Sequence, residues 1–273
     1  MGGGSALERL TAMQNLSLGM VAGVGTKMLN YPLLSTKNAV QQGLPISFNP
    51  KVVYRGLPMA CLNLGGTTAV QFWFTGFFQK LLPGNEIRAA FLGGVFSGIP
   101  CSLWELTMIQ QQRFGGSVFG TPVNLVKQYG LAALGRGLTM TMGRESLYTM
   151  AMLGVTPALK RYIAENYELE GNTALAIGAL SGSFFSATIT HPMDTIKTCM
   201  QGDVGREKYT NVPQTGRMLA QEYGVAQGLF KGLSWRIGLI ATTFFLVNKF
   251  KEVLAPLVFP VDDDDDDEPP VKR

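Results

Sequence analysis

The chain has 273 residues, of which 46% are hydrophobic and only 15% are charged, with a net charge of +4. Soluble domains usually carry about a quarter charged residues, so this composition argues against an ordinary soluble fold. One histidine, three scattered cysteines and no basic cluster interleaved with aromatics argue against a metal site and a nucleic-acid interface.

The apolar segments predict an all-α membrane protein with six transmembrane helices. They cover residues 11–41, 56–82, 88–112, 137–162, 173–201 and 232–254. Each is long enough to cross a bilayer, which takes about 20 residues. Each also contains polar or charged residues, which normally face a bundle interior or a watery cavity. The pattern therefore predicts a pore or cavity, and it disfavours the alternative of a soluble protein built from amphipathic helices.

Three segments end the odd-numbered helices with similar residues. The third segment, 186–201, reads SATITHPMDTIKTCMQ, and segments 26–41 and 97–112 align with it on their last residue. That residue is a glutamine in all three: Gln41, Gln112 and Gln201. The alignment predicts three repeats between a flexible N-terminus and an acidic C-terminal tail. The predicted boundaries are 1–10 for the N-terminus, 11–82, 83–162 and 163–254 for the repeats, and 255–273 for the tail.

A basic residue followed by glycine opens each even-numbered helix. The three glycines are Gly56, Gly137 and Gly232. Free backbone amides at a helix start form a natural binding site for phosphate. Before the third of these glycines, residues 209–232 have the spacing of a short amphipathic helix, which is expected to lie on the membrane surface.

Together these features resemble the mitochondrial carrier family, whose repeat carries the motif P-x-[DE]-x-x-[KR]. The third repeat matches through Pro192, Asp194 and Lys197, and the resemblance spans residues 11–254. It implies six transmembrane helices with pseudo-threefold symmetry, short surface helices on the matrix side and a central substrate cavity. It also implies alternating access across the inner mitochondrial membrane, although carrier-like proteins occur in peroxisomal and plastid membranes too. Bound cardiolipin at the three glycines is implied, and no other cofactor is expected.

The resemblance further implies a matrix gate, in which the acid of each repeat pairs with the base of the next. Two pairs keep opposite charges and one has become apolar. The pairs are Glu105 with Lys197, Asp194 with Lys37, and Leu34 with Met108. Because a half-lost pair would bury an unpaired charge, the complementary loss supports the alignment. The three glutamines are implied to brace these pairs.

Substrate contacts are implied mainly on the even-numbered helices, near the bilayer midplane. Arg144 followed by Glu145 is typical of family members that carry amino acids and related zwitterions. An arginine fork suits a carboxylate, and the glutamate can pair with an ammonium. The alternative role of both residues is helix packing, because adjacent helical side chains diverge by about 100°. The candidate substrate-binding set is Lys27, Asn63, Gln71, Arg144, Glu145 and Arg236.

Two functions remain open from the sequence. The first is a carrier of a small zwitterionic or anionic metabolite. The second is a carrier-fold accessory subunit of a respiratory or ATP-synthase complex, which the loss of cytoplasmic-gate acids at 74–80 and 155–160 favours. The acidic run at 262–268 would suit a basic protein partner in such a complex. An enzyme is disfavoured because no nucleophile and base, metal ligands or phosphate loop are visible.

Overall fold

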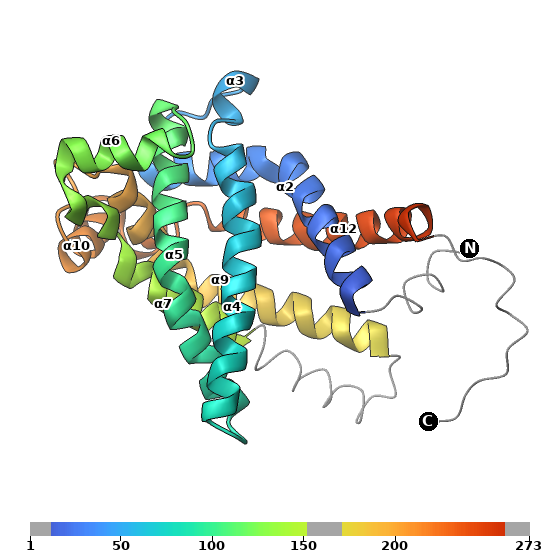
Figure 1. Cartoon of the computed structure of the whole chain (residues 1–273). Helices are drawn as coiled ribbons and strands as arrows, with labels where there is room; N and C mark the ends of the chain where they lie inside the picture. Colours follow the sequence, from blue (N-terminus) through green and yellow to red (C-terminus); the bar gives the residue numbers. More distant parts are fainter. Residues whose placement is uncertain (1–11, 152–170, 260–273) are drawn as a thin grey trace, which may run out of the picture.

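The computed structural model describes residues 12–151 and 171–259. Within these ranges the chain is all helical, which confirms the predicted fold class (Figure 1). The six main helices are α2 (Ala12–Gln42), α4 (Leu57–Leu81), α5 (Glu86–Phe114), α7 (Leu138–Thr149), α9 (Gly171–Gly202) and α12 (Leu233–Val258). The rest of the predicted fourth helix, the N-terminus that is predicted to be flexible and most of the acidic tail lie outside the described residues. The repeat boundaries stay predictions.

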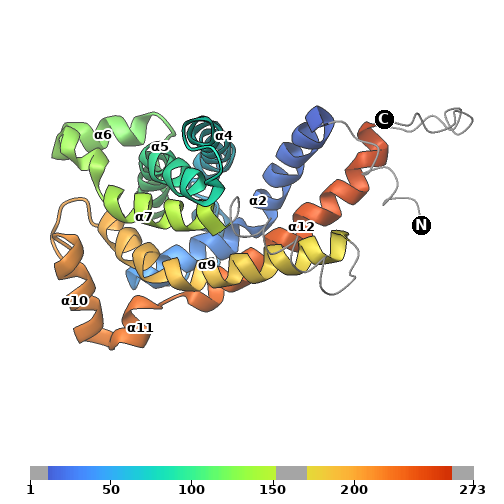
Figure 2. The same cartoon turned by 90° about the horizontal axis from the view of Figure 1, so that it is seen from below.

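The main helices form a closed ring in chain order. Each packs against the next, and α12 packs against α2. Figure 2 shows α9 running alongside both α7 and α12. Two segments of the described chain, Glu86–Phe114 and Val225–Val258, are long and apolar enough to cross a membrane by themselves, with mean hydropathies of 1.3 and 1.2. The other main helices have more polar residues, as expected where side chains face a bundle interior.

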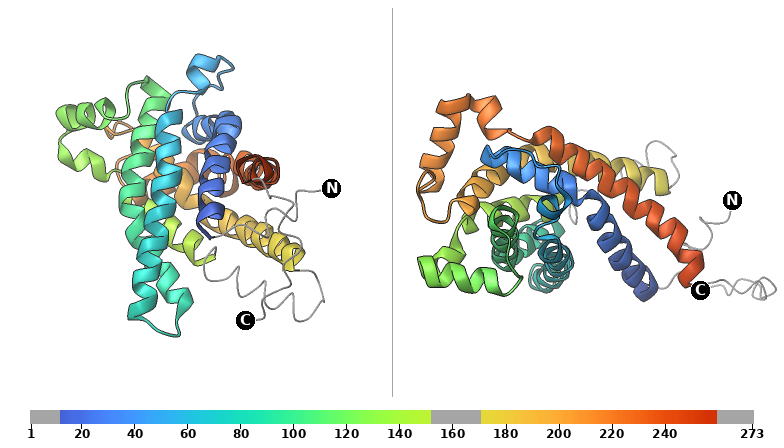
Figure 3. Two further views of the ribbon diagram at one scale, coloured as in Figure 1. Left: turned by 45° about the vertical axis from the view of Figure 1, so that its right-hand side comes forward. Right: turned by 90° about the horizontal axis from the view of Figure 1, so that it is seen from above.

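Five short helices connect the main ones within the described ranges. They are α3 (Pro50–Val53), α6 (Gly120–Tyr129), η1 (Leu131–Gly135), α10 (Val212–Tyr223) and α11 (Val225–Leu229). Figure 3 shows the green α6 and the orange α10 and α11 on the same side of the bundle, where α5 and α9 end. The first connection has only the four-residue α3, because few residues separate α2 from α4.

The glycine that opens each even helix has a left-handed backbone, with φ of 81° at Gly56, 77° at Gly137 and 83° at Gly232. A side chain with a Cβ is strained in this conformation, so glycine is favoured. None of the three caps has a side-chain hydrogen bond to the helix start. In the first and third caps the first helical amide already donates to a nearby backbone carbonyl, at 3.2 Å and 3.1 Å, so an anion would bind the amides that follow it. Cardiolipin at these positions stays a prediction.

The backbone carbonyl of the residue before each of these glycines accepts a hydrogen bond from a side chain on α2 or α9. In the first repeat the Tyr31 hydroxyl donates to the Arg55 carbonyl. In the third repeat His191 Nε2 lies 3.0 Å from the Lys231 carbonyl, which requires the proton on Nε2. Tyr31 and His191 both directly precede the motif proline, so the repeats share a contact as well as a sequence pattern.

The second repeat makes the same connection through a different side chain. Its equivalent residue is Ser102, whose side chain is short. Gln201 Nε2 instead donates to the Ser102 carbonyl and to the Arg136 carbonyl, both at 3.2 Å. A glutamine of the third repeat therefore ties α5 to the residue that precedes the Gly137 cap.

The loop after α9 is held by one carboxylate outside the membrane-spanning part. Asp203 accepts backbone N–H groups from Glu207 at 3.1 Å, Lys208 at 2.8 Å and Tyr209 at 2.7 Å. Partial burial acts to raise the pKa of Asp203, but these three donors outweigh it and lower the pKa below its usual value.

Asp203→Asn is therefore expected to lower the stability of the protein at pH 7 by about 1 kcal/mol, after allowance for solvent screening. Because the folded-state pKa is depressed, the stabilisation is complete above the unfolded pKa of about 3.9 and is lost as pH falls through the folded value. Thermal unfolding in detergent measured against pH checks this. Glu207→Gln, on the same exposed loop, is the control and should change little. If the difference in unfolding temperature between Asp203→Asn and wild type does not become smaller in acid, the ionised Asp203 carboxylate is not what stabilises the loop.

Candidate functional site

Seven charged side chains from five main helices meet inside the bundle. We call them the central charge cluster. Its members are Lys37 on α2, Glu105 on α5, Arg144 and Glu145 on α7, Asp194 and Lys197 on α9, and Arg236 on α12. All seven side chains are at most 14% exposed. Buried charges need partners, so the contacts within this cluster determine what it can bind.

The structure brings together both charged pairs of the predicted matrix gate. Lys37 Nζ lies 2.6 Å from Asp194 Oδ2, and Lys197 Nζ lies 3.0 Å from Glu105 Oε2. Lys197 Nζ also lies 3.2 Å from Asp194 Oδ1, so the two pairs are joined. The two pairs link α2, α5 and α9, which are the first, third and fifth of the six main helices. The function of these pairs as a gate stays a prediction.

The third predicted pair is an apolar contact region. Met108 is buried in a cluster with Tyr31, Met59 and neighbouring residues, and Leu34 packs against that cluster. No charge is left unpaired there, since both members of the pair have become apolar. Packing takes the place of an ionic link between α2 and α5.

The three predicted glutamine braces have different partners. Gln41 Nε2 donates to Asp194 Oδ2 at 3.1 Å, directly beside the Lys37 pair. Gln112 Nε2 donates to the Tyr31 hydroxyl at 3.0 Å and so links α5 to α2. Gln201 contacts backbone carbonyls, as described above. Among the described contacts, only Gln41 reaches an ion pair of the cluster.

Arg144 contacts the gate as well as the predicted substrate site. Its Nη2 lies 2.8 Å from Glu105 Oε1, and the guanidinium also pairs with Glu145. This contact with Glu105 was not predicted. It depends on a close approach of α5 to α7: a Cβ on Gly94 would lie 2.5 Å from the Glu145 carbonyl oxygen, and one on Gly98 would lie 2.6 Å from a Cα of α7. The small residues of α5 were the sequence signal for such an approach.

Glu145 is fully engaged by donors of the chain itself. Gln71 Nε2 donates to its Oε2 at 2.6 Å, and the Cys101 thiol donates to its Oε1 at 3.6 Å. Arg144 pairs with Oε1 as well. The structure therefore brings Gln71, Arg144 and Glu145 together. Side chains of the protein already bind both oxygens of the Glu145 carboxylate, which the sequence suggested as the partner of a substrate ammonium.

Arg236 has spare donor capacity. It is 7% exposed, and its Nη2 donates to Thr190 Oγ1 at 2.9 Å. Its Nη1 lies 3.9 Å from Asp194 Oδ2 and has no hydrogen-bond partner among the described residues. Since a buried guanidinium N–H without a partner is costly, this group is suited to an anion that the protein binds.

The remaining two predicted substrate residues do not join the cluster in the described contacts. Lys27 is half-buried on α2. Asn63 accepts from Thr67 Oγ1 at 2.8 Å within α4. No hydrogen bond or ion pair of the described residues connects either side chain to the seven charges. A contact of these two residues with substrate stays a prediction.

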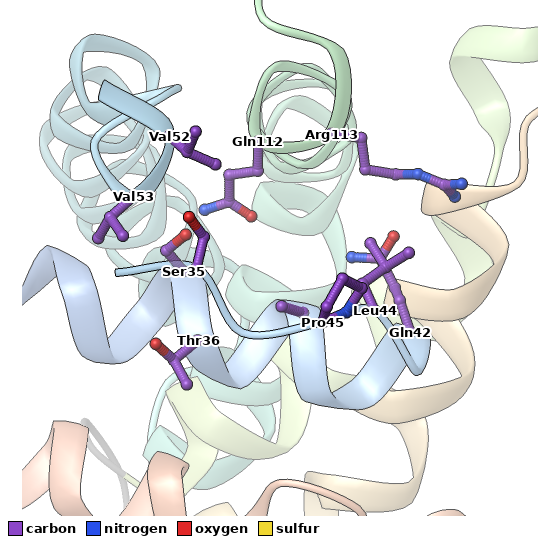
Figure 4. Close-up of a pocket in the computed structure, with 11 residues that line it drawn as sticks. Ser35, Thr36, Gln42, Leu44, Pro45, Val52, Val53, Gln112 and Arg113 are labelled. Carbon is purple, nitrogen blue, oxygen red and sulfur yellow. The ribbon is translucent and has the colours of Figure 1, made fainter. Parts of the chain in front are cut away.

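A pocket of about 270 Å³ lies between α2, α3 and the end of α5 (Figure 4). Figure 4 shows Gln112 beside Val52 and Ser35, with Arg113 directed away from them. Gln112 is the sole member of the predicted site among the lining residues. The pocket lies near the apolar third pair and is separate from the central charge cluster.

A profile of the mitochondrial carrier protein family matches residues 170–256. The mitochondrial substrate carrier family protein ucpB of Dictyostelium discoideum is 33% identical over 119 residues, which cover 43% of this chain and 40% of the relative. The mitochondrial 2-oxodicarboxylate carrier of Bos taurus is 35% identical over 200 residues, or 66% of each chain. The succinate/fumarate mitochondrial transporter of Saccharomyces cerevisiae is 24% identical over 254 residues, 80% of this chain and 78% of the relative.

Proposed function

The chain belongs to the mitochondrial carrier family, and on this premise we propose that it moves a small carboxylate anion across the inner mitochondrial membrane by alternating access. The observation that carries the proposal is the charge balance of the buried cluster. Four cations face three carboxylates, so one positive charge has no counterion in the described chain. A buried site of this kind attracts an anion. The unpaired Nη1 of Arg236 supports a carboxylate at that place, since guanidinium and carboxylate match in geometry.

The engagement of Glu145 supports an anion over a zwitterion. A zwitterionic substrate needs a carboxylate for its ammonium group. Both oxygens of Glu145 already accept from other side chains, and Glu105 and Asp194 are each paired with cations. An ammonium would have to displace a cation of the cluster, whereas a carboxylate adds the missing negative charge.

The names of two relatives described above support the same class of substrate. They are named for dicarboxylates, a 2-oxodicarboxylate and the succinate/fumarate pair. Identities of 24% to 35% support a class and not one compound. The relatives are named as carriers or transporters, which supports a protein that is not an enzyme.

Thermal unfolding of the purified protein in detergent tests the proposed substrate class. Three compounds with four-carbon chains serve as probes: succinate, neutral succinamide and zwitterionic 4-aminobutyrate. Succinate is expected to stabilise the protein, by about 2.7 kcal/mol at one hundred times its Kd. The other two are expected to have little effect. Stabilisation by 4-aminobutyrate equal to that by succinate would contradict the choice of an anion.

Arg236→Gln tests the residue that carries the proposal. This variant is expected to lose most of the stabilisation by succinate, and Arg236→Lys is expected to keep part of it because it retains the charge without the planar fork. Arg88→Gln is the matched control, since Arg88 is an exposed arginine on α5 and does not belong to the cluster. An undiminished response of Arg236→Gln to succinate would reject this site.

A further inference from the structure

The Glu105 carboxylate is shared between two cations from different helices. Its Oε1 lies 2.8 Å from Arg144 Nη2 on α7, and its Oε2 lies 3.0 Å from Lys197 Nζ on α9. One carboxylate on α5 therefore links three helices. The link to Lys197 is the predicted gate pair, whereas the link to Arg144 joins the gate to the predicted substrate site.

Arg144 is the member of the central charge cluster most accessible from outside it. Its side chain is 14% exposed, compared with 9% for Glu105 and 2% for Lys197. Its Nε has no hydrogen-bond partner among the described residues and lies 3.8 Å from Asp194 Oδ1. An entering anion therefore meets Arg144 more readily than the buried lysines, and finds a donor that is still free.

The apolar third gate pair makes the Arg144 contact more important. The Leu34–Met108 region provides no ionic link between α2 and α5. The Arg144–Glu105 pair adds an ionic link between α5 and α7. Three interhelical ion pairs of 3.0 Å or less thus join the cluster, as three would in a complete gate, but the third uses a residue that substrate can reach.

We propose that Arg144 is both a lock of the matrix gate and a substrate ligand, so that a substrate carboxylate opens this lock by displacing Glu105 from Arg144. The proposal rests on the proposed function for its substrate, but the lock itself exists in the substrate-free protein. When Arg144 turns to the substrate, Glu145 keeps its hydrogen bonds from Gln71 and Cys101. Glu105 then has Lys197 as its one remaining ion-pair partner, and the ion pair between α5 and α7 is broken.

A double-mutant cycle in the substrate-free protein tests the lock. Glu105→Gln leaves Arg144 and Lys197 without their shared carboxylate and is expected to lower the melting temperature. Adding Arg144→Gln removes one of the two cations that lost this partner, so the double variant is expected to melt higher than Glu105→Gln alone. The control is Glu105→Gln with Arg236→Gln, which removes the same charge from a residue whose described ion pair is with Asp194.

Recovery of the melting temperature with Arg144→Gln and not with Arg236→Gln supports the lock. Equal recovery in both double variants overturns the lock, because the gain would then come from the removal of any positive charge. No recovery in either also overturns it, because Arg144 would then have no coupling to Glu105. This measurement needs no ligand, so it stands whether or not the proposed substrate class is right.

Succinate binding to purified variants tests the displacement step. Glu105→Gln removes the competitor for Arg144 and is expected to bind succinate several-fold more tightly than wild type. Glu105→Gln with Lys197→Gln has the net charge of wild type and should keep this gain. Unchanged or weaker binding in the charge-matched variant overturns the displacement. If the double-mutant cycle shows the lock but wild type binds no succinate, the proposed substrate class is wrong and the contact between Arg144 and Glu105 still holds.

Discussion

Asp194→Asn is expected to cause the largest loss of stability of any single substitution in the central charge cluster. The Asp194 carboxylate lies within 4 Å of four cations: Lys37 at 2.6 Å, Lys197 at 3.2 Å, Arg144 at 3.8 Å and Arg236 at 3.9 Å. Removal of one partner from a buried ion pair costs about 3–5 kcal/mol, because the remaining charge is left uncompensated. Here four cations would share two carboxylates. The melting temperature of the purified variant measures the effect.

An exposed ion pair serves as the control for this prediction. Lys249 and Glu252 pair at 3.1 Å near the end of α12, with side chains 57% and 50% exposed. Surface pairs contribute about 0–1 kcal/mol, so Glu252→Gln should melt close to wild type. Similar melting temperatures for Asp194→Asn and wild type would show that the cluster does not hold the helices together in the membrane protein.

Gly94→Ala is expected to destabilise the contact between α5 and α7 although it adds one methyl group. The new Cβ would lie 2.5 Å from the Glu145 carbonyl oxygen and 2.5 Å from the Ser146 Cα, and backbone atoms cannot turn aside. Overpacking of this kind costs about 1–3 kcal/mol. Since α7 carries Arg144 and Glu145, its displacement should also weaken the Arg144–Glu105 pair. Thermal unfolding and succinate binding of the variant measure both effects.

The same substitution at Gly76 is the matched control. Gly76 lies inside α4, and a Cβ there would meet nothing within 4 Å. Alanine is the better helix former, so Gly76→Ala should be neutral or slightly stabilising. Equal behaviour of the two alanine variants would mean that α5 and α7 are not packed at Gly94 as the structure has them.

The repeat pattern made much of the fold predictable. The spacing of motif residues places Asp194 and Lys197 one helical turn apart on α9, and the complementary charge of Lys37 indicates that α2 meets this helix. Glycine at each cap permits the left-handed backbone that the structure shows there, since glycine adopts it without strain. These features depend on local residue types, which a single sequence displays.

The contacts of Arg144 and Glu145 could not be predicted in the same way. The sequence shows two adjacent charges on one helix, and their partners depend on how closely α7 approaches α5. That distance is set by tertiary packing at Gly94 and Gly98. The partner of Gln201 was missed for a related reason: Ser102 is too short to reach the Arg136 carbonyl, and the replacing side chain comes from another repeat.

Exchange of labelled succinate by the purified protein in liposomes tests whether the protein is a carboxylate carrier. We expect uptake that requires an internal carboxylate, is inhibited by external dicarboxylates and is not inhibited by succinamide. Arg236→Gln vesicles are expected to take up much less than Arg88→Gln vesicles at equal protein content. Absence of uptake for every mono-, di- and tricarboxylate supplied, with the thermal unfolding transition intact, would contradict transport and favour an accessory subunit with the carrier fold.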